Sequence, residues 1–116
     1  NLESFKQMIE LASIMKESLL RGDFKKFGDL MHDSWILKKA MNKKVTNPLI
    51  EDSYNTAREL GALGGKLLGA GGSGYLFIYA SPLHQKKIKK ALEDKGLRQE
   101  MFKFSNQGLE VWSINR

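Results

Sequence analysis

Residues 1–60 carry apolar side chains at steps of three and four positions, which is the spacing of an α-helix. From Leu2 to about Leu20 these steps, which include Ile9, predict one helix with a single buried face. The Gly22-Asp23 pair interrupts the pattern, and its aspartate is a typical N-cap for a second helix over Phe24–Met41. The short connection predicts that the two helices are antiparallel.

A third helix is predicted to begin at Pro48, because proline suits the first turn, where its missing N–H would have no partner in the helix. It should extend to about Leu60, and Gly61 favours its end. Strand patterns follow: a short apolar strand at Lys66–Leu68 and a longer one at Tyr75–Ala80 flank a glycine-rich turn. This arrangement predicts a β-hairpin.

A fourth helix is expected over Pro82–Lys95, with Leu83 and Ile88 on its inward face. Two final strands are expected near Arg98–Phe104 and Leu109–Ile114, and the last one should be covered on both faces. The elements therefore follow the order ααα-ββ-α-ββ. This order predicts an α+β domain in which helices pack on a four-stranded antiparallel sheet.

Composition places these elements in one globular domain, because the chain has 116 residues, of which 41% are hydrophobic and 28% charged. Cysteine is absent, which excludes a disulfide framework, a thiolate metal site and a cysteine nucleophile. Only His32 and His84 remain as imidazole ligands, so no metal site is expected. No apolar run is long enough to span a bilayer and no secretory signal pattern is visible, so the expected location is the cytoplasm.

Basic residues outnumber acidic ones by 19 to 13, and residues 61–116 carry most of the excess, with 9 basic and 4 acidic side chains. Four of the basic side chains, Lys86, Lys87, Lys89 and Lys90, are distributed around much of the predicted fourth helix. This pattern is typical of a solvated helix, and a phosphate or nucleic-acid patch is the alternative. A small basic module that binds RNA or regulates a partner is therefore a second hypothesis.

Glycine occupies six of the eleven positions in residues 64–74. Glycine is costly in chain entropy, so this density favours a segment that approaches a ligand or another backbone closely. Successive exposed N–H groups in such a turn can bind an anion. A dinucleotide-binding loop would need a helix after the glycines, and a Walker A loop would need serine or threonine where Leu67 follows Gly65-Lys66. A close-packed hairpin without a ligand is the remaining alternative.

The stretch GALGGKLLGAGGSGYLFIY at residues 61–79 resembles the third conserved motif of the GHMP kinases, a family of sugar and small-molecule kinases. Upstream, Met31–Trp35 and Val45–Glu51 resemble a helix and the V-S/T-x-P-x-I-D segment of that family. The details are most similar to the branch that phosphorylates D-glycero-D-manno-heptose 7-phosphate. Two positions depart from the pattern, since Ser73 replaces a usual glycine and Glu51 a usual aspartate.

The resemblance implies the ferredoxin-like C-terminal domain of such a kinase, and the chain is expected to be a fragment of a two-domain enzyme. The parent enzyme would use ATP and Mg²⁺, and its N-terminal domain would supply the ATP loop and the catalytic acid. That domain and a sugar phosphate are the expected partners, whereas nucleic acid and membrane are not. The fragment alone should bind no cofactor, lack activity and self-associate through its bare interdomain surface.

The resemblance also implies which residues lie near the substrate, although none of them is expected to be catalytic. The residues expected close to the substrate or its phosphates are Lys66, Gly69, Gly71, Gly72, Ser73 and Gly74, with the hairpin 69–74 closing the cleft. Weaker candidates for a substrate wall are Trp35, Lys38 and Lys39. For Trp35 a packed seam between helices is the favoured alternative.

Overall fold

Helices precede and interrupt the strands in the predicted order in the computed structural model, which describes residues 2–68, 74–100 and 109–114. The helices are α1 (Leu2–Leu20), α2 (Phe24–Met41), the short 3₁₀ helix η1 (Lys43–Val45), α3 (Pro48–Glu59) and α4 (Pro82–Asp94). The strands are β1 (Gly64–Leu68), β2 (Gly74–Tyr79), β3 (Arg98–Glu100) and β4 (Leu109–Ile114). The α+β class is confirmed, while residues 101–104 of the predicted third strand lie outside the described ranges.

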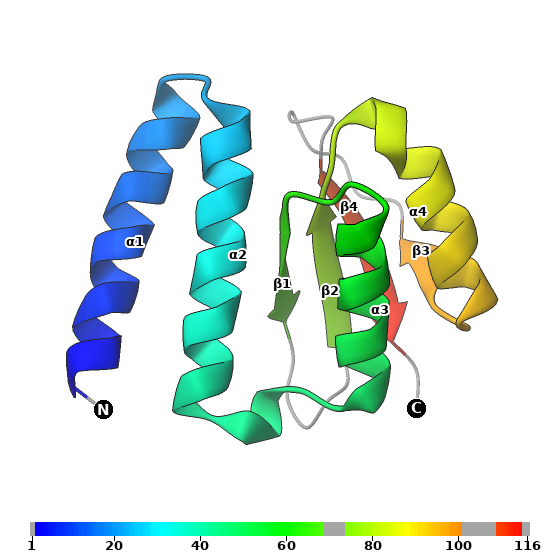
Figure 1. The fold of residues 1–116 in the computed structure, drawn as a ribbon, viewed down its shortest axis with the longest axis horizontal. Helices are drawn as coiled ribbons and strands as arrows, with labels where there is room; N and C mark the ends of the chain where they lie inside the picture. The colour runs from blue at the N-terminus through cyan, green and yellow to red at the C-terminus, as the bar shows by residue number, and fades with distance from the viewer. Residues whose placement is uncertain (1, 69–73, 101–108, 115–116) are drawn as a thin grey trace.

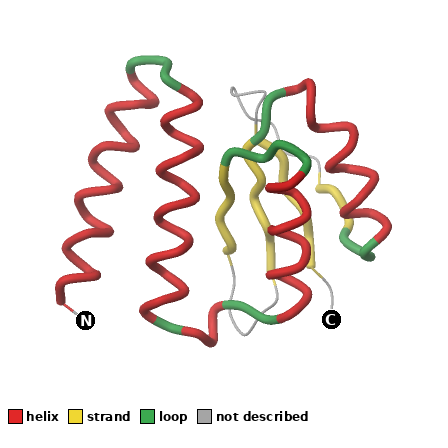
Figure 2. The backbone as a smooth tube through the Cα atoms, in the orientation of Figure 1, coloured by secondary structure: helices red, strands yellow, loops and turns green. Residues whose placement is uncertain are grey.

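The four strands form one antiparallel sheet in the order β1-β2-β4-β3 (Figures 1 and 2). Helices α3 and α4 cover one face of this sheet, whereas α2 lies along β1 and α1 packs on the outer side of α2. Strand β4 therefore has a strand on either side. Its Val111, Trp112 and Ile114 are all buried, as expected for a strand covered on both faces.

Two side-chain caps explain where the second and third helices begin. Asp23 accepts a hydrogen bond from the backbone N–H of Lys26, with 3.2 Å between nitrogen and oxygen, and so caps α2 as predicted. Asn47 accepts one from the N–H of Ile50 at 2.9 Å and places Pro48 in the first turn of α3. Both caps satisfy N–H groups that have no partner within the helix.

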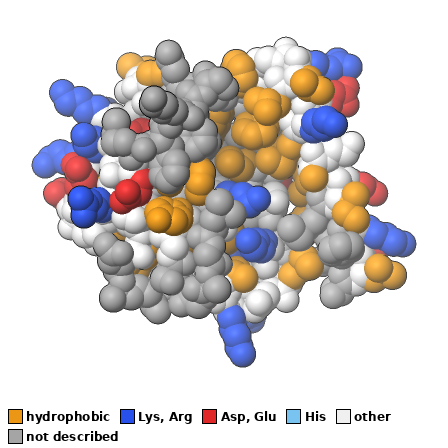
Figure 3. Space-filling view, turned by 180° about the vertical axis from the view of Figure 1, so that it is seen from behind, with side chains coloured by type: hydrophobic (Ala, Val, Ile, Leu, Met, Phe, Trp, Pro, Cys, Tyr) orange, Lys and Arg blue, Asp and Glu red, His pale blue; other side chains and the backbone are white. Residues whose placement is uncertain are grey.

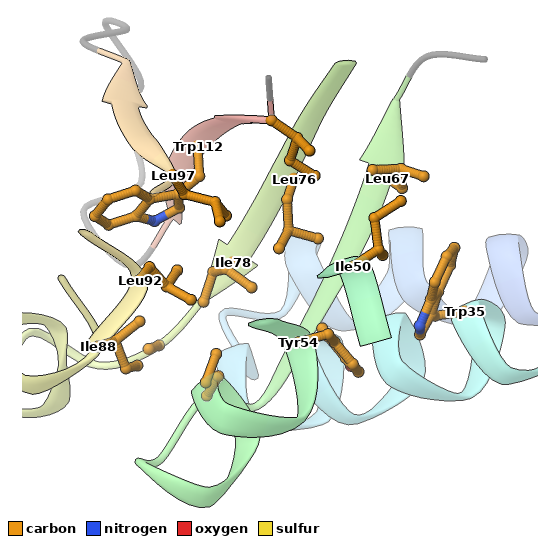
Figure 4. Packing of buried hydrophobic residues seen from close by; sticks show 14 residues of the cluster. Trp35, Ile50, Tyr54, Leu67, Leu76, Ile78, Ile88, Leu92, Leu97 and Trp112 are labelled. Atoms are coloured by element: carbon orange, nitrogen blue, oxygen red, sulfur yellow. The ribbon is translucent and has the colours of Figure 1, made fainter. Parts of the chain in front are cut away.

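The main core lies between the sheet and helices α3 and α4 (Figure 4). Ile50 and Tyr54 from α3 and Leu92 from α4 pack there against Leu76 and Trp112 of the sheet, each at most 1% exposed. Burial of such side chains is the main driving force for folding.

Two predictions of inward-facing residues are wrong. Ile9 in α1 is 58% exposed and Leu83 in α4 is 82% exposed. The reason for Ile9 is that α1 packs mainly on α2, so its buried stripe is narrower than the apolar pattern indicated. Leu83 lies in the first turn of α4, while the buried residues of that helix, Ile88 and Leu92, begin later.

Glycine lets the backbones of α2 and β1 come into direct contact. Strand β1 begins at Gly64, two residues before the predicted start, and a methyl group on Gly64 would overlap the carbonyl oxygen of Gly28 in α2. A Cβ on Gly28 would in turn lie 2.5 Å from the Cβ of Leu63. Two glycines of the dense segment, Gly64 and Gly65, thus serve close packing between elements.

We expect Gly64→Ala to lower the free energy of unfolding by roughly 2–3 kcal/mol, because the atoms in the way belong to backbone and cannot rotate aside. Gly22→Ala is the matched control. Gly22 has a φ of 74° but open space around it, so only backbone strain of about 1 kcal/mol is expected there. Urea denaturation of both variants measures the difference, and equal losses would contradict the packing argument.

Aromatic side chains from α2 and α3 join these helices to the edge strand β1. The rings of His32 and Tyr54 stack with centroids 5.7 Å apart, and Trp35 meets Tyr54 edge-on at 6.2 Å. The hydroxyl of Tyr54 accepts the backbone N–H of Gly65 and lies 2.6 Å from Nδ1 of His32. The hydroxyl therefore donates its proton to Nδ1, which requires His32 to be neutral at that nitrogen.

Burial sets the protonation of this aromatic seam. Burial raises the pKa of Tyr54 to about 12, so its hydroxyl keeps its proton. Partial burial, reinforced by the positive charge of Arg58, lowers the pKa of His32 from 6.5. The unfolded chain therefore takes up a proton on His32 at a higher pH than the folded chain does.

Folding stability should consequently hold above about pH 6.5 and decline as the pH falls through the lowered pKa of His32. His32→Phe keeps the stacked ring but cannot titrate, so we expect a lower melting temperature near neutrality and a flatter decline towards acid. Thermal melts between about pH 7.5 and about pH 5 measure this slope. His84→Gln, the control at the other histidine, should keep the wild-type slope. An unchanged slope in His32→Phe would refute the coupling.

Candidate functional site

A pocket of about 400 Å³ lies between α1, α2 and the edge strand β1. Its size falls in the range of roughly 300–1,000 Å³ that is usual for small-molecule sites. The lining residues are Ala12, Met15, Lys16, Phe27, Met31, Ser34, Trp35, Lys38, Gly65 and Lys66. The contact between α2 and β1 brings Trp35, Lys38 and Lys66, three of the residues expected near the substrate, to this one pocket.

Three lysines from three different elements line the pocket, namely Lys16 of α1, Lys38 of α2 and Lys66 of β1. Within the described ranges no carboxylate forms an ion pair with any of them. Figure 3 views the face of the sheet that α3 and α4 leave open, and it shows basic side chains beside clustered hydrophobic ones near its middle. A pocket of this kind suits an anion with a less polar body.

Lys39 takes a different place from its neighbour Lys38. Its ammonium nitrogen lies 2.8 Å from Oε1 of Glu51, whose other oxygen accepts the hydroxyl of Thr46 at 3.0 Å. The same nitrogen is 5.5 Å from the ring centroid of Trp35. The charge of Lys39 is thus compensated by the glutamate that replaces the usual aspartate, and Lys39 joins α2 to the start of α3.

Trp35 combines both interpretations that the sequence left open. Only 3% of it is exposed and it packs on Tyr54, so it forms part of the seam between α2 and α3. Part of its surface also lines the pocket. It serves mainly as a rigid apolar wall against which the neighbouring Lys38 is held.

The glycine hairpin is only partly described. Gly74 opens β2 with a φ of 121°, a conformation that favours glycine. Gly69, Gly71, Gly72 and Ser73, which are expected near the phosphates, lie outside the described residues. Because β1 ends at Leu68 and pairs with β2, the segment 69–73 connects the two antiparallel strands, as the sequence predicted.

Sequence reasoning missed Lys16 and Ser34 as pocket residues. A signal was present for Lys16, because it lies four positions after Ala12 and borders the apolar face of α1. Lysines in such positions are common on solvated helices, so spacing alone did not distinguish it. Ser34 gave no signal, since only the contact of α2 with β1 places it at the pocket.

The basic side chains of α4 are distributed as a solvated helix would have them. Lys86, Lys87, Lys89 and Lys90 are all exposed, and Lys90 lies 3.9 Å from Asp94. In the described part of the chain no group of three histidine or acidic residues could hold a metal ion. None of the described helices is long and apolar enough to cross a membrane.

Comparison with known proteins gives the same direction as the glycine motif. Residues 15–98 match the family model of the GHMP kinases C-terminal domain. The chain is 34% identical to a D-glycero-alpha-D-manno-heptose 7-phosphate kinase from Campylobacter jejuni over 98% of its own length and 34% of that protein. It is 32% identical to a mevalonate kinase from Thermococcus sibiricus, over 97% of its own length and 34% of that protein.

A third relative, an L-fucokinase/L-fucose-1-P guanylyltransferase from Bacteroides fragilis, is 34% identical over 81% of this chain and 10% of that protein. The chain thus spans about a third or less of these relatives, each of which is named for a kinase activity. The family match covers both the aromatic seam and β1, where the pocket lysines Lys38 and Lys66 lie. The chain belongs to the C-terminal domain family of the GHMP kinases.

Proposed function

We propose that this chain is the C-terminal domain of an ATP-dependent kinase that phosphorylates a hydroxyl group of a sugar or sugar phosphate. The observation that carries the proposal is the position of Lys66, which lines the pocket and precedes the glycine segment 69–73 by three residues. The similarity to a heptose 7-phosphate kinase and to a fucokinase supports a sugar as the acceptor. The parent enzyme would act in the cytoplasm, where ATP is abundant.

We assign ATP, Mg²⁺ and the catalytic acid to an N-terminal domain of the parent. The described residues here include no cluster of acids suited to Mg²⁺. This chain would supply the glycine hairpin 69–74, directed towards the phosphates and closing the cleft. Exposed N–H groups in such a turn bind anions, and the ammonium group of Lys66 adds a full positive charge.

Phosphoryl transfer suits this division of labour. The bond between the γ-phosphorus and its bridging oxygen breaks while a bond to the acceptor oxygen forms, with little covalent chemistry for the protein. The rate depends on positioning the two reactants and on stabilising the negative charge of the transition state. Isolated from the other domain, this chain should not transfer phosphate from ATP to any sugar phosphate.

We expect Gly72→Val in the parent kinase to lower kcat/KM at least about tenfold, equivalent to ~1.4 kcal/mol. A β-branched side chain would restrict the turn and introduce a methyl group where a phosphate must approach. A coupled kinase assay with ATP measures the loss. Ser73→Gly is the matched control and should have a much smaller effect, because glycine is the usual residue there.

Circular dichroism and thermal melts must accompany these kinetics. A Gly72→Val enzyme with wild-type folding and reduced kcat/KM supports a role for the hairpin at the phosphates. Unchanged kinetics contradict that role. Loss of folding together with activity would favour a purely structural turn.

A further inference from the structure

The pocket between α1, α2 and β1 concentrates positive charge without a compensating group. Its ten lining residues include Lys16, Lys38 and Lys66 but no aspartate or glutamate. The neighbouring Lys39, by contrast, has Glu51 at 2.8 Å. The absence of acids at the pocket therefore differs from the arrangement a few ångströms of helix away, where the chain provides a partner.

Three like charges at one pocket repel one another, and each ammonium group loses hydration as the walls close around it. An anion bound between them removes the repulsion and replaces the lost water. The cost of the arrangement in the free protein thus becomes a gain in affinity when an anion is bound.

The apolar part of the lining strengthens this effect. Met15, Phe27, Met31 and Trp35 supply surfaces that cannot compete for the anion, and they lower the local dielectric constant. The hydroxyl of Ser34 is the one uncharged side-chain donor in the lining. Lysine ammonium groups around a pocket with one hydroxyl are well suited to a phosphate group, which offers several acceptor oxygens.

We propose that this pocket binds a phosphate group that the acceptor substrate already carries, so that Lys16, Lys38 and Lys66 select phosphorylated acceptors over uncharged sugars. The proposal rests on the proposed kinase function and deepens it. It gives the acceptor a class, a phosphate monoester with a second hydroxyl to be phosphorylated. It also adds Lys16, from the helix farthest from the sheet, to the specificity residues.

The phosphates of the nucleotide are a poorer match for the same pocket. ATP reacts as its Mg²⁺ complex, and Mg²⁺ is held in proteins through carboxylates together with water and phosphate oxygens. The lining contains no carboxylate. The lysines supply three separate point charges, which suit a terminal phosphate monoester without a metal ion.

The test is equilibrium binding to the parent kinase, with the nucleotide site filled by Mg²⁺ and a non-hydrolysable ATP analogue. Isothermal titration calorimetry compares three probes: inorganic phosphate, glucose 6-phosphate and glucose. We expect the two phosphates to bind and glucose to bind at least about tenfold more weakly. Lys38→Gln and Lys66→Gln should each weaken phosphate binding about tenfold, and Lys16→Gln about threefold because its side chain is exposed on α1.

Lys87→Gln, which removes the same charge from the exposed surface of α4, is the matched control and should leave phosphate binding unchanged. Thermal melts verify that all variants fold. Phosphate affinity that is equal in Lys38→Gln, Lys66→Gln and the control overturns the proposal. Weakened binding of the ATP analogue with unchanged phosphate affinity also overturns it, because the lysines would then serve the nucleotide.

Steady-state kinetics separate this proposal from the kinase function. If the parent phosphorylates sugars but Lys38→Gln leaves KM for phosphorylated acceptors unchanged, the pocket assignment fails and the kinase function stands. If no acceptor is turned over while the lysines still determine phosphate affinity, the pocket assignment stands and the kinase function fails.

Discussion

The direct contact between the backbones of α2 and β1 is the constraint on which the rest of the structure depends. It exists because Gly28 and Gly64 lack side chains at the point where helix and strand meet. Any Cβ there would hold the two elements apart, and the interior of a protein has little free space to absorb such a shift. The contact also covers the outer edge of the sheet, which would otherwise present unpaired backbone groups.

The same contact determines the chemistry available beside it. With α2 held against β1, Tyr54 of α3 reaches the N–H of Gly65 and stacks on His32, so that three elements share one aromatic seam. Lys38 and Lys66, which are 28 positions apart in the sequence, then line one pocket. A site made in this way depends on packing at a distance from its charged groups, and changes in the seam will alter it.

Much of the fold could be predicted because local patterns and packing agree. Asp23 and Pro48 placed helix starts correctly, and the run Tyr75–Ala80 identified a buried strand to within one residue at each end. The exposed Ile9 shows the limit, because an amphipathic pattern does not reveal how many elements will cover it. The site was less predictable. Spacing placed Trp35 beside Lys39 on one helix face, but only the tertiary structure separates Lys39, paired with Glu51, from its neighbour at the pocket.

The position of β4 has a consequence for how the chain folds as it is made. This strand comes last of the described elements, yet it lies inside the sheet, between β2 and β3. During synthesis, the hairpin of β1 and β2 leaves the ribosome with one of its edges open, and β3 has no strand to pair with until residues 109–114 emerge. The helices can form early from local contacts, but the sheet closes in a single late step. A ribosome that stalls before Leu109 would therefore present a nascent chain with an exposed apolar strand edge, a natural target for chaperones.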